Sequence, residues 1–270
     1  MIWIAWKTKE RTGVFYMLLS YFDFTKLWDN ITSSDNVKTI VIFVGVIVAL
    51  FLIAIQAERI IDKAKGTTEK KQFRTQRMTI IAMLSALAVI LNMLSFSLPF
   101  FVPSFYKFDF SDFPAIIGAF ALGPIAGVVI TTVKTLLNIV INGTMTGFVG
   151  EFALFMIGCT FVIPVSIVYY FKRTKKSAVI GLWISVVLVV LVGCIMNEHV
   201  LLPAYTAMLP MDAIIGMGTK INPAITGMGT FIMFAVAPFN LVKYSVLAAL
   251  TTFTYKPISR LLTGIRNKQG

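Results

Sequence analysis

Four residues in an otherwise apolar chain have side chains that could hydrogen-bond a polar ligand. Glu151 follows the Gly- and Thr-rich string INGTMTGFVG, Asn197 begins NEHVLLPAY, and Asn240 and Lys243 belong to APFNLVK. Residues three apart on a helix project from one face, so Asn240 and Lys243 can act together. Charged and amide side chains are costly at membrane depth, and each is expected to have a partner or a ligand.

Each of these residues also has an ordinary explanation. A carboxylate such as Glu151 is stabilised in the first turn of a helix by the macrodipole. Lys243 could snorkel to the membrane surface beside a capping Asn240 if the helix crosses from Pro238 onward. If the helix begins near Gly229, Lys243 lies near the middle of the bilayer. Snorkelling then explains it poorly, and a ligand role is favoured.

Charge also gathers in the string FYKFDFSDFPAIIGAFALGPIAG, which holds Asp109 and Asp112. We interpret both as residues of an outer loop that gates a pocket, with Asp112 or Ser111 capping the next helix. Residues 200–237 are too long and apolar for a plain turn and predict a structured lid, to which Tyr205 would contribute an aromatic wall.

Two further features concern the helices themselves. Lys134 separates two apolar runs, 113–133 and 135–150, and is predicted to lie in a turn at the membrane surface. Ala82 and Ala86, four residues apart, form a stripe of small residues that lets another helix approach closely. Spacing alone does not say whether that helix belongs to this chain or to a partner subunit.

The composition places these residues in a membrane. The chain has 270 residues, of which 57% are hydrophobic and 13% charged, with a mean hydropathy of +0.85. A soluble globule of this size could not bury so much apolar surface. Apolar runs close to the roughly 20 residues needed to span a bilayer recur along the chain, uncharged except for Lys243 in the last. They are 39–55, 78–102, 113–133, 135–150, 152–171, 178–196 and 239–255.

The net charge of +12 does not indicate nucleic-acid binding, because its distribution fits a membrane protein. Fifteen of the 24 basic residues lie in three clusters, 59–77, 172–176 and 256–268. The positive-inside rule places these clusters in the cytoplasm. The loops between them carry acidic residues and are predicted to lie outside.

Threading the chain through these loops predicts an all-α integral membrane protein with its C-terminus in the cytoplasm of a prokaryotic cell. Residues 1–73 form an N-terminal extension with one span at about 39–55. Residues 74–263 form a six-helix substrate-binding membrane domain, and residues 264–270 form a cytoplasmic tail.

Motifs for catalysis and metal binding are missing from the sequence. Cys159 and Cys194 fall within spans and are interpreted as small buried residues rather than a disulfide or metal pair. His199 is the single histidine, and there is no HExxH, CxxC or Walker-type glycine loop. We therefore expect no enzyme, no catalytic residues, no metal and no cofactor.

Several strings together resemble a known family. SFSLPFFVPSFYKFDFSDFPAIIGAFALGPIAG, NGTMTGFVGEFALFMIG, NEHVLLPAY, GTKINPAIT and APFNLVK are similar to the substrate-binding S components of energy-coupling factor (ECF) vitamin transporters, above all the riboflavin-specific group. The resemblance covers roughly residues 74–262. It implies a six-helix S-component bundle, to which this chain adds one N-terminal transmembrane helix.

The resemblance also implies a function and a set of roles. The ligand would be riboflavin or its phosphate FMN, taken up across the cell membrane. A transmembrane coupling protein and two ATP-binding subunits would do the ATP-driven work. Asn240, Asn197 and Lys243 would bind the flavin ring and Glu151 the ribityl hydroxyls, while Ala82 and Ala86 would contact the coupling protein.

Two alternatives remain open at the level of sequence. The same fold could bind thiamine, folate or another vitamin, because the residues themselves do not identify the ligand. An intramembrane enzyme would need an acid and a base or nucleophile at one depth, for which His199 beside Glu198 is thin support.

Overall fold

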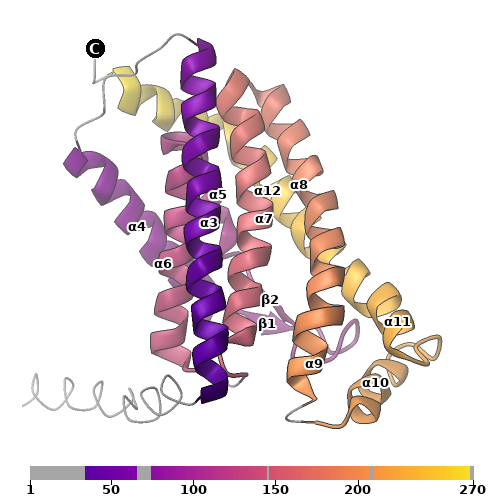
Figure 1. The fold of residues 1–270 in the computed structure, drawn as a ribbon. Coiled ribbons are helices and arrows are strands. Elements are labelled where there is room, and N and C mark those ends of the chain that lie inside the picture. Colours follow the sequence, from indigo (N-terminus) through magenta and orange to yellow (C-terminus); the bar gives the residue numbers. More distant parts are fainter. Residues whose placement is uncertain (1–33, 66–73, 145, 207–208, 268–270) are drawn as a thin grey trace, which may run out of the picture.

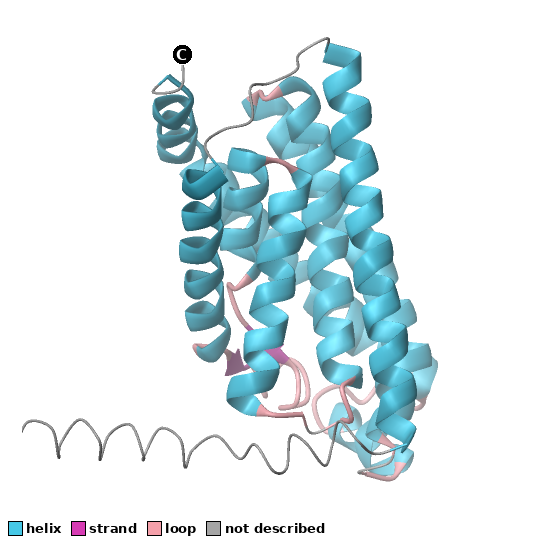
Figure 2. Ribbon diagram, turned by 60° about the vertical axis from the view of Figure 1, so that its left-hand side comes forward, coloured by secondary structure: helices cyan, strands magenta, loops and turns pink. Residues whose placement is uncertain are grey.

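The computed structural model describes residues 34–65, 74–144, 146–206 and 209–267 of the chain. Helices make up nearly all of this part, and Figure 2 shows one pair of short strands among the loops at one end of the bundle. Six helical segments are long and apolar enough to cross a membrane, and one more apolar helix is shorter. The predicted all-helical membrane fold is therefore confirmed.

The long segments run along the bundle (Figure 1). They are α3 (Ser34–Lys65), α4 (Arg74–Met93), α6 (Pro124–Asn142) and α7 (Val149–Lys172), followed by two composite segments. The first composite joins α8 (Lys175–Met196), a π-helical turn at Asn197–Leu201 and α9 (Leu202–Tyr205). The second joins α11 (Met228–Phe231), a π-helical turn at Ile232–Val236 and α12 (Ala237–Asn267). Helices α4 and α6 point the same way because the short α5 (Asp112–Leu122) lies between them in the chain (Figure 1).

The second helix of the predicted bundle is shorter than expected. We predicted a helix over 113–133 and a turn at Lys134, but α5 (Asp112–Leu122) has only 11 residues and the turn falls at Gly123. Gly123 has φ 98°, which glycine adopts without strain, and Pro124 opens α6 without needing a backbone donor. The turn at Lys134 was therefore wrong, because the Gly-Pro pair ends the helix and Lys134 lies inside α6.

The last two spans both continue toward the lid through a π-helical turn. We expected the first to end near Asn197, and it extends further. For the second we weighed a start at Pro238 against one near Gly229, and its start at Met228 agrees with the latter. Each π-helical turn comes shortly before a proline, Pro203 or Pro238. A wider turn accommodates the proline ring, which otherwise clashes with the carbonyl four residues earlier. Lys243 consequently lies well inside a span that begins at Met228.

A lid covers one end of the bundle (Figure 1). It consists of the first loop (residues 94–111), α9, α10 (Met211–Thr219) and α11. In the first loop, β1 (Phe96–Ser97) pairs with β2 (Lys107–Phe108) in an antiparallel hairpin that the sequence did not predict. Buried aromatic and aliphatic side chains, including Phe108, Ile214 and Phe231, join the loop to the lid helices. The prediction that residues 200–237 are structured is confirmed for the described part of that segment.

The additional helix α3 packs along the bundle. Phe43 lies 5.7 Å from Phe152 and 5.6 Å from Phe155, measured between ring centroids, so α3 contacts α7 through aromatic side chains. At the end opposite the lid, Glu58 lies 3.7 Å from Arg77 of α4. Arg77 in turn donates to the carbonyl oxygen of Leu122 at the end of α5. Residues 1–33 of the predicted extension lie outside the described residues.

Close packing of α5, α6 and α7 generates a first prediction. A Cβ added at Gly127 would lie 2.5 Å from Val162 and 2.8 Å from the Cβ of Ala119. Gly127→Ala should therefore lower the free energy of unfolding by about 1 to 3 kcal/mol, because neighbouring helices must separate. Gly216→Ala is the control, since a Cβ there meets nothing within 4 Å. Thermal unfolding in detergent measures both, and equal melting temperatures would contradict the packing.

Candidate functional site

A buried cluster of charged side chains connects the first loop to three helices. Asp109 of the first loop accepts a hydrogen bond from the Lys243 ammonium of α12 at 2.7 Å. It also accepts from the backbone N–H of Ser111 at 2.9 Å and from the Ser111 hydroxyl. Asp109 and Lys243 are both buried, at 4% and 6% exposure. Lys243 therefore anchors the first loop to the second turn of α12, near the middle of the span Met228–Tyr255.

The same cluster continues into α6. Lys134 donates to Asp112 at 2.6 Å and to the Ser111 hydroxyl oxygen at 3.1 Å, with no exposed surface. The second oxygen of Asp112 accepts from the Tyr244 hydroxyl at 3.2 Å. We call the six residues Asp109, Ser111, Asp112, Lys134, Lys243 and Tyr244 the charge cluster. Both of its ends, Lys243 and Tyr244, lie on α12.

The charge cluster is electrically balanced, with two lysines and two aspartates. Burial by itself would raise the pKa of Asp109, but Lys243 and Lys134 lower that pKa to about 2. Asp109 is therefore a carboxylate at physiological pH. Buried charges are tolerated only with partners and complete hydrogen bonding, which this arrangement supplies.

Two of our sequence-based interpretations change in the light of this geometry. Asp109 and Asp112 were read as loop and cap residues, yet both are buried ion-pair partners. Ser111 is at the N-cap of α5 but makes no capping hydrogen bond, because its hydroxyl donates to Asp109. The capping role was wrong, since sequence spacing could not show lysines approaching from α6 and α12.

The two candidate asparagines lie beside the charge cluster on the neighbouring spans. Asn197 and Asn240 are buried and each donates to the carbonyl oxygen four residues earlier, Gly193 at 2.7 Å and Val236 at 3.0 Å. The amide of Asn240 faces Gly193, where an added Cβ would come within 2.8 Å of its nitrogen. The structure therefore brings Asn197 and Asn240 together at Gly193, where α8 and α12 meet, with Lys243 about one turn further along α12.

The first loop contacts Asn197 as well as Lys243. The Tyr106 hydroxyl donates to the Asn197 side-chain oxygen at 2.5 Å. The Tyr106 ring packs on Phe239 at 5.4 Å and on Phe105, which in turn packs on Tyr205 at 5.2 Å. Two of the predicted ligand-binding side chains are thus hydrogen-bonded by lid residues, Tyr106 and Asp109.

Glu151 lies in the first turn of α7, as predicted. Its carboxylate accepts a hydrogen bond from Thr144 at 3.0 Å. Glu151 is partly exposed, unlike the two asparagines. It therefore belongs to the outer part of the site, next to the lid.

Comparison with known proteins identifies the family. Residues 76–255 match the family described as "ECF transporter, substrate-specific component". The riboflavin transporter RibU of Staphylococcus aureus (strain TCH60) is 32% identical over 200 residues, covering 74% of this chain and 99% of that protein. The chain belongs to the ECF substrate-specific components.

Other relatives agree with this assignment. The riboflavin transporter FmnP of Bacillus subtilis (strain 168) is 29% identical over 183 residues, which is 67% of this chain and 91% of FmnP. A solved S component of a bacterial ECF transporter superposes with a TM-score of 0.55 at 32% identity, covering 70% of this chain and 98% of that one. The chain is thus a multi-pass membrane component of a vitamin transporter, which works with ECF module partners, and not an enzyme.

The residues considered for an enzyme do not form a catalytic set in this S component. Glu198 and His199 are exposed on the π-helical turn, whereas Asn197 beside them is buried. Cys159 and Cys194 are both free thiols. Among the described residues, no group of three potential metal ligands occurs.

Ala82 and Ala86 lie on the exposed face of α4. The same face presents large apolar side chains, among them Met78, Met83 and Ile90. Ser85 and Ala88, two further small residues of α4, are instead buried against the bundle. The small residues of α4 therefore serve two faces, one within the S component and one open to the membrane.

Sequence reasoning missed Lys134, Ser111 and Tyr244 as members of the charge cluster, and it missed the hydrogen bond from Tyr106 to Asn197. The signal for Lys134 was available, because a lysine within an apolar segment next to a short helix beginning with Asp is a candidate for a buried pair. Tyr106 and Tyr244 gave no such signal. Only the folded chain shows which aromatic hydroxyls face a polar partner.

The charge cluster gives a second prediction. Lys134→Met should lower the free energy of unfolding by about 3 to 5 kcal/mol, because Asp112 is left as an unpaired buried charge. Adding Asp112→Asn should recover at least half of that loss. Lys107→Met, at an exposed lysine of the first loop, is the control. Asp112→Asn alone completes the comparison. If the double variant lost as much free energy of unfolding as the two single variants together, the two residues would not form a buried pair.

Proposed function

We propose that this S component binds riboflavin and confers riboflavin specificity on an ECF-type, ATP-driven uptake transporter. The observation that carries the proposal is the burial of Asn197, Asn240 and Lys243 beneath the lid, where residues of the first loop hydrogen-bond Asn197 and Lys243. Relatives described as riboflavin transporters support the choice of vitamin. FMN, which shares the flavin ring, is a second ligand to be tested.

The chemistry of the three side chains suits a flavin ring. The pyrimidine edge of the isoalloxazine presents carbonyl oxygens and nitrogens in one plane and needs both donors and acceptors. Lys243 has three N–H groups, and Asp109 uses one of them. The Asn240 amide has a second N–H beyond the one donated to Val236. Both residues can therefore donate to a ligand while keeping their present hydrogen bonds.

Loading the site requires the lid to move. Tyr106 and its aromatic neighbours occupy the space between Asn197 and the lid helices. We propose that the flavin ring displaces Tyr106 from Asn197, while Asp109 keeps its bond to Lys243. Glu151, closer to the surface, would accept hydrogen bonds from the ribityl hydroxyls.

The orientation in the membrane follows from the charges. The ends opposite the lid carry Arg59, Lys63, Lys172 and Lys176, which the positive-inside rule places in the cytoplasm. The lid then faces outward, as uptake requires, and the C-terminus lies in the cytoplasm. The exposed alanines of α4 would face the coupling protein, and two ATP-binding subunits would complete the transporter.

Isothermal titration of the purified protein tests the proposed ligand. Riboflavin should bind with submicromolar affinity, and thiamine and folate in tenfold excess should not compete. FMN in the same titration shows whether the phosphate is tolerated. Tight binding of thiamine or folate in place of riboflavin would overturn the proposal while leaving the family unchanged.

A third prediction concerns the binding residues. Asn240→Ala and Lys243→Ala should each weaken riboflavin binding by about 1 to 3 kcal/mol, because a buried hydrogen bond to the ligand is lost. Asn142→Ala, at an exposed asparagine of α6, should leave affinity unchanged. Calorimetry on folded variants measures all three affinities. Unchanged riboflavin affinity in both Asn240→Ala and Lys243→Ala would mean that riboflavin binds elsewhere.

A fourth prediction concerns the face of α4. Ala82→Trp should leave riboflavin affinity intact and abolish uptake, because it adds bulk to the surface proposed to meet the coupling protein. Val187→Trp is the matched control, since Val187 is 57% exposed on α8. Uptake of labelled riboflavin in cells expressing each variant measures the effect. Normal uptake by Ala82→Trp would place the coupling surface elsewhere.

A further inference from the structure

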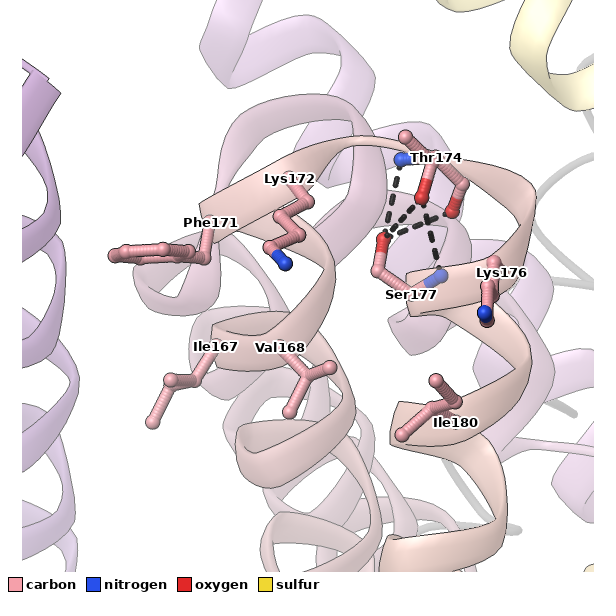
Figure 3. A pocket seen from close by; sticks show the side chains of 8 residues that line it. All are labelled: Ile167, Val168, Phe171, Lys172, Thr174, Lys176, Ser177 and Ile180. Atoms are coloured by element: carbon pink, nitrogen blue, oxygen red, sulfur yellow. Dashed lines mark hydrogen bonds between the residues drawn. The ribbon is translucent and has the colours of Figure 1, made fainter.

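An open groove lies between α7 and α8 at the end of the bundle opposite the lid. It has a volume of about 610 Å³ and is lined by Ile167, Val168, Phe171, Lys172, Thr174, Lys176, Ser177 and Ile180. Figure 3 shows Lys172 of α7 and Lys176 of α8 on opposite sides, with Ile167, Val168 and Ile180 on the side away from the turn. The groove is therefore apolar toward the middle of the spans and basic at its mouth.

The polar groups of the connecting turn are already engaged. Ser177 donates its backbone N–H to the Thr174 hydroxyl at 3.1 Å, and the Ser177 hydroxyl accepts from the Thr174 backbone N–H at 3.1 Å. Arg173 places its guanidinium 4.6 Å from the centre of the Tyr170 ring. The turn is thus fixed by its own hydrogen bonds, and the lysines are the cations that face the groove.

The two lysines are available to a ligand. Both are exposed, and within the described part of the chain neither takes part in an ion pair. They stand at the ends of two membrane-crossing helices, at the depth where lipid head groups lie. A ligand that matches this surface needs a negative charge at the membrane surface and an apolar chain that follows the helices inward.

We infer that this groove is a binding site for an anionic glycerophospholipid. Its phosphate would lie between the ammonium groups of Lys172 and Lys176, and one acyl chain would lie along Ile167, Val168 and Ile180. Basic pockets between helix ends on the cytoplasmic side are known to take acidic head groups, and each nearby lysine is worth about 1 kcal/mol. This site is separate from the charge cluster and the lid, and it does not depend on which vitamin is bound.

Native mass spectrometry of the delipidated full chain, titrated with phosphatidylglycerol in detergent, tests the site. Lys172→Gln with Lys176→Gln should weaken binding of the first phosphatidylglycerol by about 30-fold, which is about fivefold for each lysine. The control variant, Arg59→Gln with Lys63→Gln, also removes two positive charges. These residues are exposed on α3, at the same end of the bundle as the groove. This control pair should change the affinity less than twofold, and phosphatidylcholine should bind the wild type at least tenfold more weakly.

A second pair of variants tests the apolar half of the groove without changing charge. Ile180→Trp fills the groove and should weaken phosphatidylglycerol binding at least fivefold. Ile184→Trp, one turn further along the same exposed face of α8, should have no such effect. Far-ultraviolet circular dichroism shows that each variant is folded before titration.

The outcomes that overturn the site are distinct. If the variant of Lys172 and Lys176 and the variant of Arg59 and Lys63 lost equal affinity for phosphatidylglycerol, binding would depend only on the net charge of the protein. Inorganic phosphate competing as well as the lipid would mean that no acyl chain is bound. Unchanged lipid binding in the variant of Lys172 and Lys176, together with weaker assembly with the coupling protein, would make this surface a protein interface instead.

Discussion

The ion pair between Asp109 and Lys243 is the interaction on which the arrangement of the site depends. It joins the first loop to the second turn of α12, across 134 positions of sequence. Ser111, Lys134 and Asp112 extend the contact to α5 and α6, and Tyr244 returns it to α12. Such a network is stable in a membrane only when every member has a partner, so it fixes the relative positions of the helices and the lid together.

The paired π-helical turns explain why polar residues accumulate where α8 and α12 meet. Each turn adds a residue to the helical repeat and shifts the faces of the helix beyond it. Asn197 lies in the first of these turns and Asn240 follows the second by one helical turn. Gly193 leaves the space that the Asn240 amide occupies. A lid bonded to Asn197 and Lys243 can respond to a ligand that contacts the same side chains.

Much of the fold followed from the sequence, because bilayer thickness and charge asymmetry leave few ways to thread apolar segments. The spans, their alternating directions and the structured lid were predictable in this way. Lys134 was misplaced because a lysine between apolar runs resembles a turn residue until its partner Asp112 is known. The ion pairs of Asp109 and Asp112 were missed for the same reason. Sequence spacing predicts which face a residue occupies, but it does not show which distant helix supplies the counter-charge.

The position of the first loop on α12 depends most directly on the coupling between Asp109 and Lys243. A double-mutant cycle on the free energy of unfolding measures this coupling. The variants are Asp109→Asn, Lys243→Met and the two combined, each unfolded by denaturant in detergent. If the two residues are coupled, the combined variant loses less free energy of unfolding than the two single variants lose together. The expected difference is at least about 1.5 kcal/mol, because the combined variant leaves no unpaired buried charge. Strictly additive losses would contradict this coupling and would leave the lid without its anchor on α12.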